Sequence, residues 1–460
     1  TIKKFRIFIS SLICLLATTG TGLAQTSVPI SKTIEERIAQ LEKEIQVLKR
    51  QQEVAQEVQV KRDVETPVVS ASKDGFGLKA KDSSFQLKFK TVLQTDGRFY
   101  VNDNTPAGTD TFLIRKMRPI LEGTVFNYFD FRLMPDFGGG TTQLFDAYVD
   151  YRYWSCASLK AGKVKSPIGL ERLQSDTNNM FTELSLTQNL VPNRDVGLDL
   201  HGELFTGIVN YDVGVFNGAA DGTNLDTDVH DSKEFVGRIF MLPFKNLAKD
   251  WLTGFGFGLG SGIGNSHGSA SNPNLATYKS DGQQTIFRYR NDGTANGTTI
   301  ADGLRTHIAP QFYYYVGPLG VLGEYVISSQ DVKRGNYNKG YVENTAGQIA
   351  VSYLLTGEKA SYYGVVPRNN FDPGKRKWGA LEVLSRFNWL DNADGNFPLY
   401  ADTNNSVNSA TAWGFGLNWY LNKCLKLVLD FEHTFFKGGN YNGQDRKTED
   451  VFISRVQLAF

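Results

Sequence analysis

Cationic side chains border one stretch of the chain, residues 165–194, in a pattern that favours the binding of anions. Lys165 stands at its start, Arg172 within it and Arg194 at its end. Ammonium and guanidinium groups donate charge-assisted hydrogen bonds to phosphate and carboxylate oxygens. The acids Glu171, Asp176 and Glu183 lie in the same stretch, and Asp195 directly follows it. Cations at the narrowest point of a water-filled passage bias it toward anions, so these three are the first candidates for a functional site.

Residues that could serve catalysis or bind a metal form no coherent group. Gly264-Asn-Ser-His-Gly268 matches a nucleophile-elbow pattern, but that site needs a helix after the turn, and a Gly/Ser/Asn run follows here. The histidines are scattered without metal-ligand spacing: His201, His230, His267, His307 and His433. The acids of stretch 221–231 could gather calcium, although a solvated acidic loop is the stronger interpretation: Asp221, Asp226, Asp228 and Asp231. We expect no enzyme, no metal site and no cofactor.

The stretch 450–460 shows what kind of element positions the cations. Phe452, Val456 and Leu458 share one parity, whereas Arg455 and Gln457 share the other. Side chains of a strand alternate between two faces, so this strand has one apolar and one polar face. A strand whose apolar face meets lipid must have every backbone group paired, and a closed barrel achieves this with sheet.

Similar alternation recurs along the chain, and an even strand number places both ends of a barrel on one side of the membrane. The sequence therefore predicts an all-β fold, a transmembrane antiparallel barrel of sixteen strands over residues 81–460. Strands are expected near 85–99, 111–125, 129–137, 143–154, 157–165, 195–206, 208–217, 233–241, 252–263, 304–316, 319–329, 344–356, 378–390, 409–421, 424–435 and 450–460.

The inward faces of these strands collect charges of both signs, and most are expected to brace the wall as ion pairs. The inward basic residues are Lys88, Lys90, Arg98, Arg118, Arg132, Arg152, Lys160, Arg238, Arg305, Arg386 and Arg455. Of these, Lys88, Arg98, Arg132 and Arg152 are predicted to share the anion path with Lys165, Arg172 and Arg194.

The residues before the barrel have a different composition. Residues 1–24 read as a secretory signal, with Lys3, Lys4 and Arg6 before an apolar run. Without these three cations the net charge of +1 becomes −2, which argues against nucleic acid as a partner. Residues 31–60 carry heptads and predict a short periplasmic coiled coil, with a lone amphipathic helix as the alternative. Residues 61–80 are expected to be a linker, and Cys156 and Cys424 are too few for a disulfide framework.

Three connections stand out by length or composition. Residues 166–194 contain apolar side chains that a solvated loop does not need, so we expect this loop to fold into the barrel and constrict it; a cap outside the barrel is the alternative. Residues 264–303 are rich in Gly, Ser, Asn and Thr, which suits an external, solvated loop. Residues 357–377 fall on the periplasmic side, where turns are short. Either this long connection is a structured turn, or the predicted strand count is wrong at this point.

Several motifs spread over the barrel region resemble one known family. They are Lys163-Val-Lys-Ser-Pro-Ile-Gly-Leu-Glu171, Leu190-Val-Pro-Asn-Arg-Asp-Val-Gly197, Gly214-Val-Phe-Asn-Gly218, Tyr363-Gly-Val-Val-Pro367, Asn370-Phe-Asp-Pro373, Leu417-Asn-Trp-Tyr-Leu-Asn422 and Leu458-Ala-Phe460. With them the chain resembles the phosphate-selective porin O and P family of Gram-negative outer membranes.

The resemblance implies a sixteen-strand barrel, a homotrimer in outer-membrane lipid, and passage of small anions such as phosphate or polyphosphate along Lys and Arg side chains. It also implies that the terminal Phe460 is read by the barrel-assembly machinery. A general or weakly selective porin is the first alternative. An outer-membrane barrel enzyme or a secreted adhesin is a more remote one.

Overall fold

The computed structural model describes residues 34–65, 67–72, 74–101, 108–228, 230–247 and 250–460. It divides into two units, residues 1–63 and 64–460, and all the described strands lie in the second unit. Residues 34–60 of the heptad segment lie in helix α1 (Ile34–Glu65), and residues 31–33 lie outside the described part of the chain. Ile38, Leu41, Ile45 and Leu48, on the predicted seam, are exposed in the single chain. Their pairing in a coiled coil stays a prediction. No described helix is long and apolar enough to cross a membrane.

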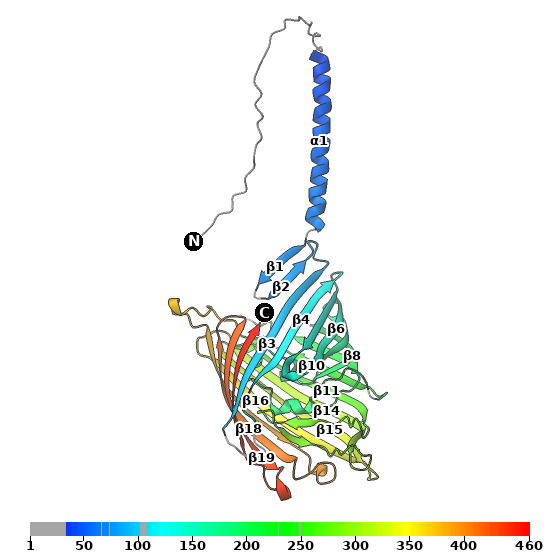
Figure 1. Cartoon of the computed structure of the whole chain (residues 1–460), viewed down its shortest axis with the longest axis vertical. Helices are drawn as coiled ribbons and strands as arrows, with labels where there is room; N and C mark the ends of the chain where they lie inside the picture. The colour runs from blue at the N-terminus through cyan, green and yellow to red at the C-terminus, as the bar shows by residue number, and fades with distance from the viewer. Residues whose placement is uncertain (1–33, 66, 73, 102–107, 229, 248–249) are drawn as a thin grey trace, which may run out of the picture. The chain divides into compact units, whose positions relative to one another are not determined.

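Within the described residues, sixteen antiparallel strands close into a barrel, which confirms the predicted fold class (Figure 1). The strands are β3 (Gln86–Tyr100), β4 (Thr111–Val125), β5 (Phe129–Asp136), β6 (Gln143–Trp154), β7 (Ala157–Lys165), β8 (Arg194–Leu204), β9 (Val209–Phe216), β10 (Glu234–Met241), β11 (Phe255–His267), β14 (Thr299–Val316), β15 (Leu319–Arg334), β16 (Gly340–Leu354), β17 (Ala380–Asp391), β18 (Val407–Tyr420), β19 (Leu425–Gly438) and β20 (Glu449–Ala459). Short helices α2 (Leu170–Leu173), α3 (Asp250–Thr253), η1 (Gly138–Gly140), η2 (Leu186–Leu190), η3 (Pro373–Lys375), η4 (Asp394–Asn396) and η5 (Tyr441–Gly443) lie in the connections.

The last strand closes the barrel by pairing with the first. Phe452 lies opposite Phe99 and Leu458 opposite Leu93 in the β20–β3 ladder. The terminal Phe460 extends it, because its N–H and C=O pair with the carbonyl and amide of Thr91 at 3.2 and 3.0 Å. Phe452 and Val456 point outward and are exposed, whereas Arg455 and Gln457 point inward and are buried, as the alternation predicts.

Part of the predicted linker 61–80 is a hairpin. Strands β1 (Val68–Ser72) and β2 (Gly75–Lys79) pair with each other, and β2 pairs with the first residues of β3, below the point where β20 ends. The start of β3 would otherwise have free backbone groups along that edge. Gly75, at φ +97°, permits the close approach, since a Cβ there would lie 2.4 Å from the Phe89 carbonyl oxygen.

The long external loop 264–303 also differs from expectation, because it has a small core. It contains the hairpin β12 (Thr277–Lys279) and β13 (Thr285–Arg288). Tyr278, Ile286, Phe287 and Tyr289 are buried and belong to one apolar cluster with wall residues of β15–β18. The composition of the loop is polar, but these few apolar residues are spaced to fold it back onto the barrel wall.

The segment between β16 and β17 is a structured turn, so the strand count holds. It includes η3 and the buried Ala360 and Glu358. The hydroxyl of Tyr362 donates to the Leu170 carbonyl oxygen at 2.8 Å, so this turn reaches loop 166–194.

Candidate channel constriction

Loop 166–194 packs against the inner face of the barrel wall. Ile168, Leu170, Leu186 and Leu190 have no exposed surface. Its polar groups bond to side chains of β3 and β14–β20, on strands that follow one another around the barrel. The loop therefore occupies one side of the interior.

A single wall carboxylate, Glu324 of β15, holds both short helices of this loop. It accepts hydrogen bonds from the backbone N–H of Leu170 at 2.7 Å, the hydroxyl of Thr187 at 3.0 Å and the amide nitrogen of Gln188 at 2.6 Å. Gln348 of β16 adds a fourth bond at 2.9 Å. All five residues are buried, so these charge-assisted bonds form out of water and are strong.

Other wall side chains satisfy the irregular backbone of the loop. Inside a barrel such backbone groups need partners, because buried unpaired groups are costly. Donors to loop carbonyls are Gln311 to Ile168 at 2.9 Å, Gln457 to Thr177 at 3.0 Å, Asn418 to Met180 at 2.9 Å, Arg455 to Thr182 at 2.5 Å and Arg386 to Glu183 at 2.9 Å. The loop is thus built into the wall at many points.

Two further segments touch the loop, one from each end of the barrel. From the β16–β17 turn, Tyr362 bonds to Leu170 as described and accepts from the Gln174 side chain at 2.8 Å. From the external hairpin, Lys279 exchanges two bonds with the Asn189 side chain, each of 2.9 Å. The interior is therefore narrowed by three segments.

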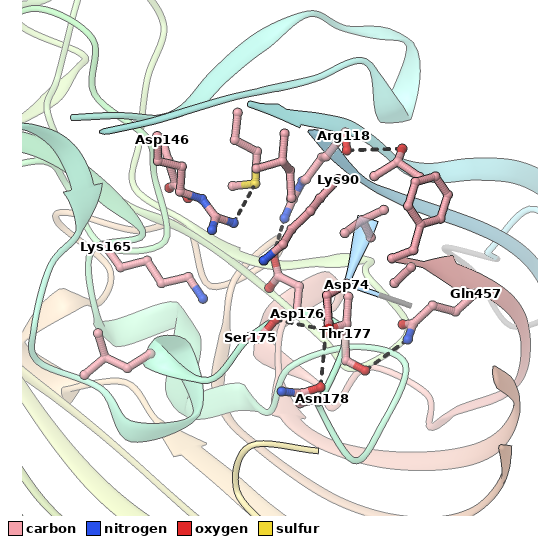
Figure 2. Close-up of a pocket in the computed structure, with 18 of the residues that line it drawn as sticks. Asp74, Lys90, Arg118, Asp146, Lys165, Ser175, Asp176, Thr177, Asn178 and Gln457 are labelled. Carbon is pink, nitrogen blue, oxygen red and sulfur yellow. Dashed lines mark hydrogen bonds and ion pairs between the residues drawn. The ribbon is translucent and has the colours of Figure 1, made fainter. Parts of the chain in front are cut away.

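A cavity of about 570 Å³ remains between the loop and the wall formed by β3–β9 and β18–β20 (Figure 2). Eight Lys or Arg residues and five Asp residues line it. The cations are Lys90, Arg118, Arg132, Lys160, Lys165, Arg194, Lys423 and Lys426, and the acids are Asp74, Asp146, Asp176, Asp199 and Asp212. In Figure 2 the side chains of Lys90 and Lys165 both point into this space.

Most of these cations are tied to carboxylates. Arg118 pairs with Asp176 of the loop and with Asp136 at 2.6 Å. Arg194 lies 3.2 Å from Asp146 and 3.8 Å from Asp176. Burial acts to raise the pKa of Asp176, but Lys116 and Arg118 outweigh it and hold this pKa well below its ordinary value. Asp176 therefore stays ionised within the cationic cluster.

Lys165, like Lys426, lines the cavity without an ion pair among the described residues. Its ammonium group donates to the Gln174 carbonyl oxygen at 2.6 Å. Among the described residues no carboxylate oxygen lies within 4.0 Å of it. The amino group of Lys165 therefore reaches the cavity without a direct ion pair among the described residues.

The structure separates the three cations of loop 166–194. Lys165 and Arg194 line the cavity, but Arg172 does not. Arg172 lies on α2 and its guanidinium donates to the Gln188 carbonyl oxygen at 2.8 Å, within the fold of the loop. Burial, aided by Arg194, lowers the pKa of Arg172 to about 10. Arg172 therefore bridges two parts of the loop, and its share in an anion path stays a prediction.

The four predicted wall cations also differ in whether they line the cavity. Arg132 lines the cavity and pairs with Glu122 at 2.9 Å and Asp146 at 3.1 Å. Arg98 is turned to Glu183 of the loop at 2.5 Å. Lys88 and Arg152 are not among the described residues that line the cavity, and Arg152 pairs with Asp130.

Other cavity residues were not assigned to the path from sequence. Lys90, Arg118 and Lys160 have the inward parity, which is the signal that identifies them. Lys423 follows β18 in a short turn, where no periodicity marks it.

The acidic stretch 221–231 does not gather its carboxylates. Asp221 bonds to His307, Asp226 pairs with Lys163 at 2.5 Å, and Asp228 pairs with Lys233. No group of three possible metal ligands occurs among the described residues.

The stretch that matches the nucleophile-elbow pattern is part of a strand. Ser266 lies in β11 and accepts from the Asn274 side chain at 2.9 Å, and no helix follows it before β12. The strand, turn and helix of that motif are therefore not formed.

Comparison with solved structures supports the barrel fold. The outer membrane channel DcaP of Acinetobacter baumannii matches with a TM-score of 0.54 and 11% identity, covering 84% of this chain and 99% of that one. The OmpT of Vibrio cholerae expressed in the outer membrane matches with a TM-score of 0.51 and 10% identity, covering 83% and 100%. No curated protein matches in sequence. At these identities the likeness concerns the fold alone.

The family model for phosphate-selective porin O and P matches residues 85–460. This range takes in the whole barrel, the internal loop and the terminal Phe460. The chain belongs to the phosphate-selective porin O and P family, and it is a porin of the outer membrane.

Proposed function

We propose that this porin passes small hydrophilic solutes and prefers small anions, such as phosphate, along the cavity beside loop 166–194. The observation that carries the proposal is Lys165, whose ammonium group faces the cavity without a carboxylate within 4.0 Å among the described residues. The excess of eight cations over five acids in the lining supports it.

The size of the effect follows from the distance at which an anion could approach. At about 4 Å a single charge contributes roughly 1 kcal/mol in bulk water and about 4 kcal/mol where the effective dielectric constant is about 20. Paired wall charges largely cancel at the same distance. Low-dielectric walls focus the field of the unbalanced charge, so one such lysine is enough to shift selectivity.

The experiment compares Lys165→Gln with Lys163→Gln in planar bilayers. Both changes remove one cation from β7, but Lys163 is paired with Asp226 and does not line the cavity. In a KCl gradient Lys165→Gln should move the reversal potential toward cations and weaken the reduction of chloride current by added phosphate. Lys163→Gln should leave both near the wild-type values. Equal effects of the two changes, or none, would contradict the proposal.

The assembly we propose is a homotrimer in outer-membrane lipid, with α1 helices joined as a periplasmic coiled coil and Phe460 serving the barrel-assembly machinery. The family resemblance implies the trimer, and OmpT of Vibrio cholerae has itself been solved in a trimer form. The heptads and the exposed seam residues of α1 support the helical bundle. Cross-linking in native membranes tests the number of subunits, and a monomer would contradict it.

A further inference from the structure

A buried cluster of charged groups lies outside the cavity, around His307 of β14. The ring nitrogen Nδ1 lies 3.1 Å from Glu234 of β10, and Nε2 lies 2.7 Å from Asp221 of the β9–β10 connection. Both carboxylates are buried, and the His307 side chain has no exposed surface. A neutral imidazole has one N–H, so it can donate to one carboxylate at most. Both ring nitrogens can donate a hydrogen bond to their carboxylates only when the ring carries two protons.

The surrounding groups fit a protonated ring. Arg305, also of β14, donates to Glu234 at 2.8 Å, and the Ser328 hydroxyl of β15 donates to Asp221 at 2.6 Å. Two carboxylates thus face one guanidinium and one imidazolium, which balances the charge. Burial acts to raise the pKa of Asp221, but His307 outweighs it, and this pKa lies below its ordinary value.

Asp221 belongs to segment 217–225, which runs beside the end of loop 166–194. Gly222 N–H donates to the Val191 carbonyl oxygen at 2.8 Å, and Asn193 N–H donates to that of Thr223 at 3.1 Å. Leu225 N–H donates to the carbonyl oxygen of Arg194 at 3.0 Å. Segment 217–225 therefore holds the backbone at Arg194 in place. His307 in turn holds this segment through Asp221.

A third carboxylate, Asp195 of β8, fixes the start of this segment. It accepts from the N–H groups of Gly218 and Ala219 at 2.7 and 2.8 Å. Beyond the segment, His230 lies 3.7 Å from Asp228 and does not bond to His307 in the described contacts. Among the elements packed here, Asp221 and Glu234 are thus the carboxylates in direct contact with the ring of His307.

We propose that His307 is a positioning residue of the channel: as an imidazolium between Asp221 and Glu234, it fixes segment 217–225 and, through it, Arg194 at the cavity. Loss of the ring proton removes one hydrogen bond and leaves two carboxylates facing a single guanidinium. The segment then separates from the wall as the pH rises. The consequence for selectivity rests on the proposed function, but the consequence for the segment does not.

The test follows the position of the segment by thiol labelling of Ala220→Cys, in full-length protein with Cys156→Ser and Cys424→Ser. Ala220 is buried, so a bulky maleimide reports its release. His307→Gln, His307→Lys and the control His201→Gln carry the same cysteine, and comparison at equal pH cancels the reactivity of the thiol. His201 bonds to Asp150 at 3.0 Å on another part of the wall.

At about pH 7, the thiol introduced by Ala220→Cys should be labelled at least about ten times faster in His307→Gln than in the wild type. This is the factor expected for loss of one charge-assisted hydrogen bond. The wild type should approach that rate as the pH is raised from about 6 to about 10, through the range where histidine loses its proton. His307→Lys keeps a charge and should label slowly throughout, as should the control. If His307→Gln folds poorly, the pH series of the wild type against His201→Gln remains decisive.

Equal labelling of His307→Gln and the wild type at every pH would overturn the inference, as would a pH dependence shared by His201→Gln and His307→Lys. The reversal potential in a KCl gradient is measured on the same variants. Faster labelling with an unchanged potential would uphold the role of His307 in holding the segment and would count against Arg194 as part of the anion path.

Discussion

Replacing Glu324 by Gln should loosen loop 166–194 while leaving the barrel closed. The carboxylate accepts four buried hydrogen bonds, three of them at one oxygen and the bond from Leu170 at the other. An amide offers a single oxygen, so at least the Leu170 N–H would face an NH₂ group. The remaining bonds lose the charge of their acceptor.

The magnitude follows from these contacts. A hydrogen bond to a charged group contributes about 1.5 to 3 kcal/mol, and a neutral one about 1 kcal/mol. One lost bond and three weakened ones together cost roughly 3 kcal/mol or more, which corresponds to about a hundredfold change in the population of the detached loop. The strand ladders do not involve this side chain, so the barrel itself should stay folded.

The assay is single-channel recording in planar bilayers, with the heat-modifiable band on gels as the check of barrel folding. Because the loop fills one side of the interior, Glu324→Gln should raise the mean conductance and the current noise. The matched control is Glu343→Gln, which removes a carboxylate from β16 that bonds to the Tyr341 hydroxyl at 3.0 Å and not to the loop. Conductance and noise equal to those of the control would refute the role of Glu324.

Three further predictions concern charge, assembly and the N-terminal helix. Asp176→Asn removes the acid that pairs with Arg118 and Lys116, so the reversal potential in a KCl gradient should move further toward anions, and a move toward cations would oppose the charge argument. Removing Phe460 takes away its two backbone bonds to Thr91 and the family's assembly signal, so the amount of heat-modifiable protein in the outer membrane should fall; normal levels would count against it. Deleting residues 31–60 should leave a conducting barrel, because the strands and cavity lie in residues 64–460, whereas loss of conductance would make this segment part of the pore.

The strands could be predicted because each carries its own signal. In β20 the alternation of Phe452 and Val456 with Arg455 and Gln457 indicates which face meets lipid. The pairing of β20 with β3 follows because the barrel must close. Inward parity likewise identified Lys90, Arg118 and Arg132. Ends of strands were less certain, as β14 begins at Thr299 and β15 ends at Arg334, beyond the alternating core of each.

Features that depend on contacts between residues far apart in the sequence could not be predicted in this way. Whether a cation is balanced depends on which carboxylate the fold brings to it, so sequence could not separate Lys165 from Arg172. The hairpin β1–β2 covers the first residues of β3, which β20 does not reach. No local sequence pattern indicates this pairing. The core of loop 264–303 rests on a few residues such as Tyr278 and Phe287, whose partners lie on distant strands.

The proposed preference of this porin for small anions can be measured on the unmodified channel. Its most direct test is the reversal potential of the wild-type channel in a KCl gradient whose dilute side is about 0.15 M, where charges are screened over roughly 8 Å. A preference for anions should displace the potential toward the equilibrium potential of chloride, and added phosphate should then lower the chloride current. A reversal potential at zero, or displaced toward that of potassium, would contradict it.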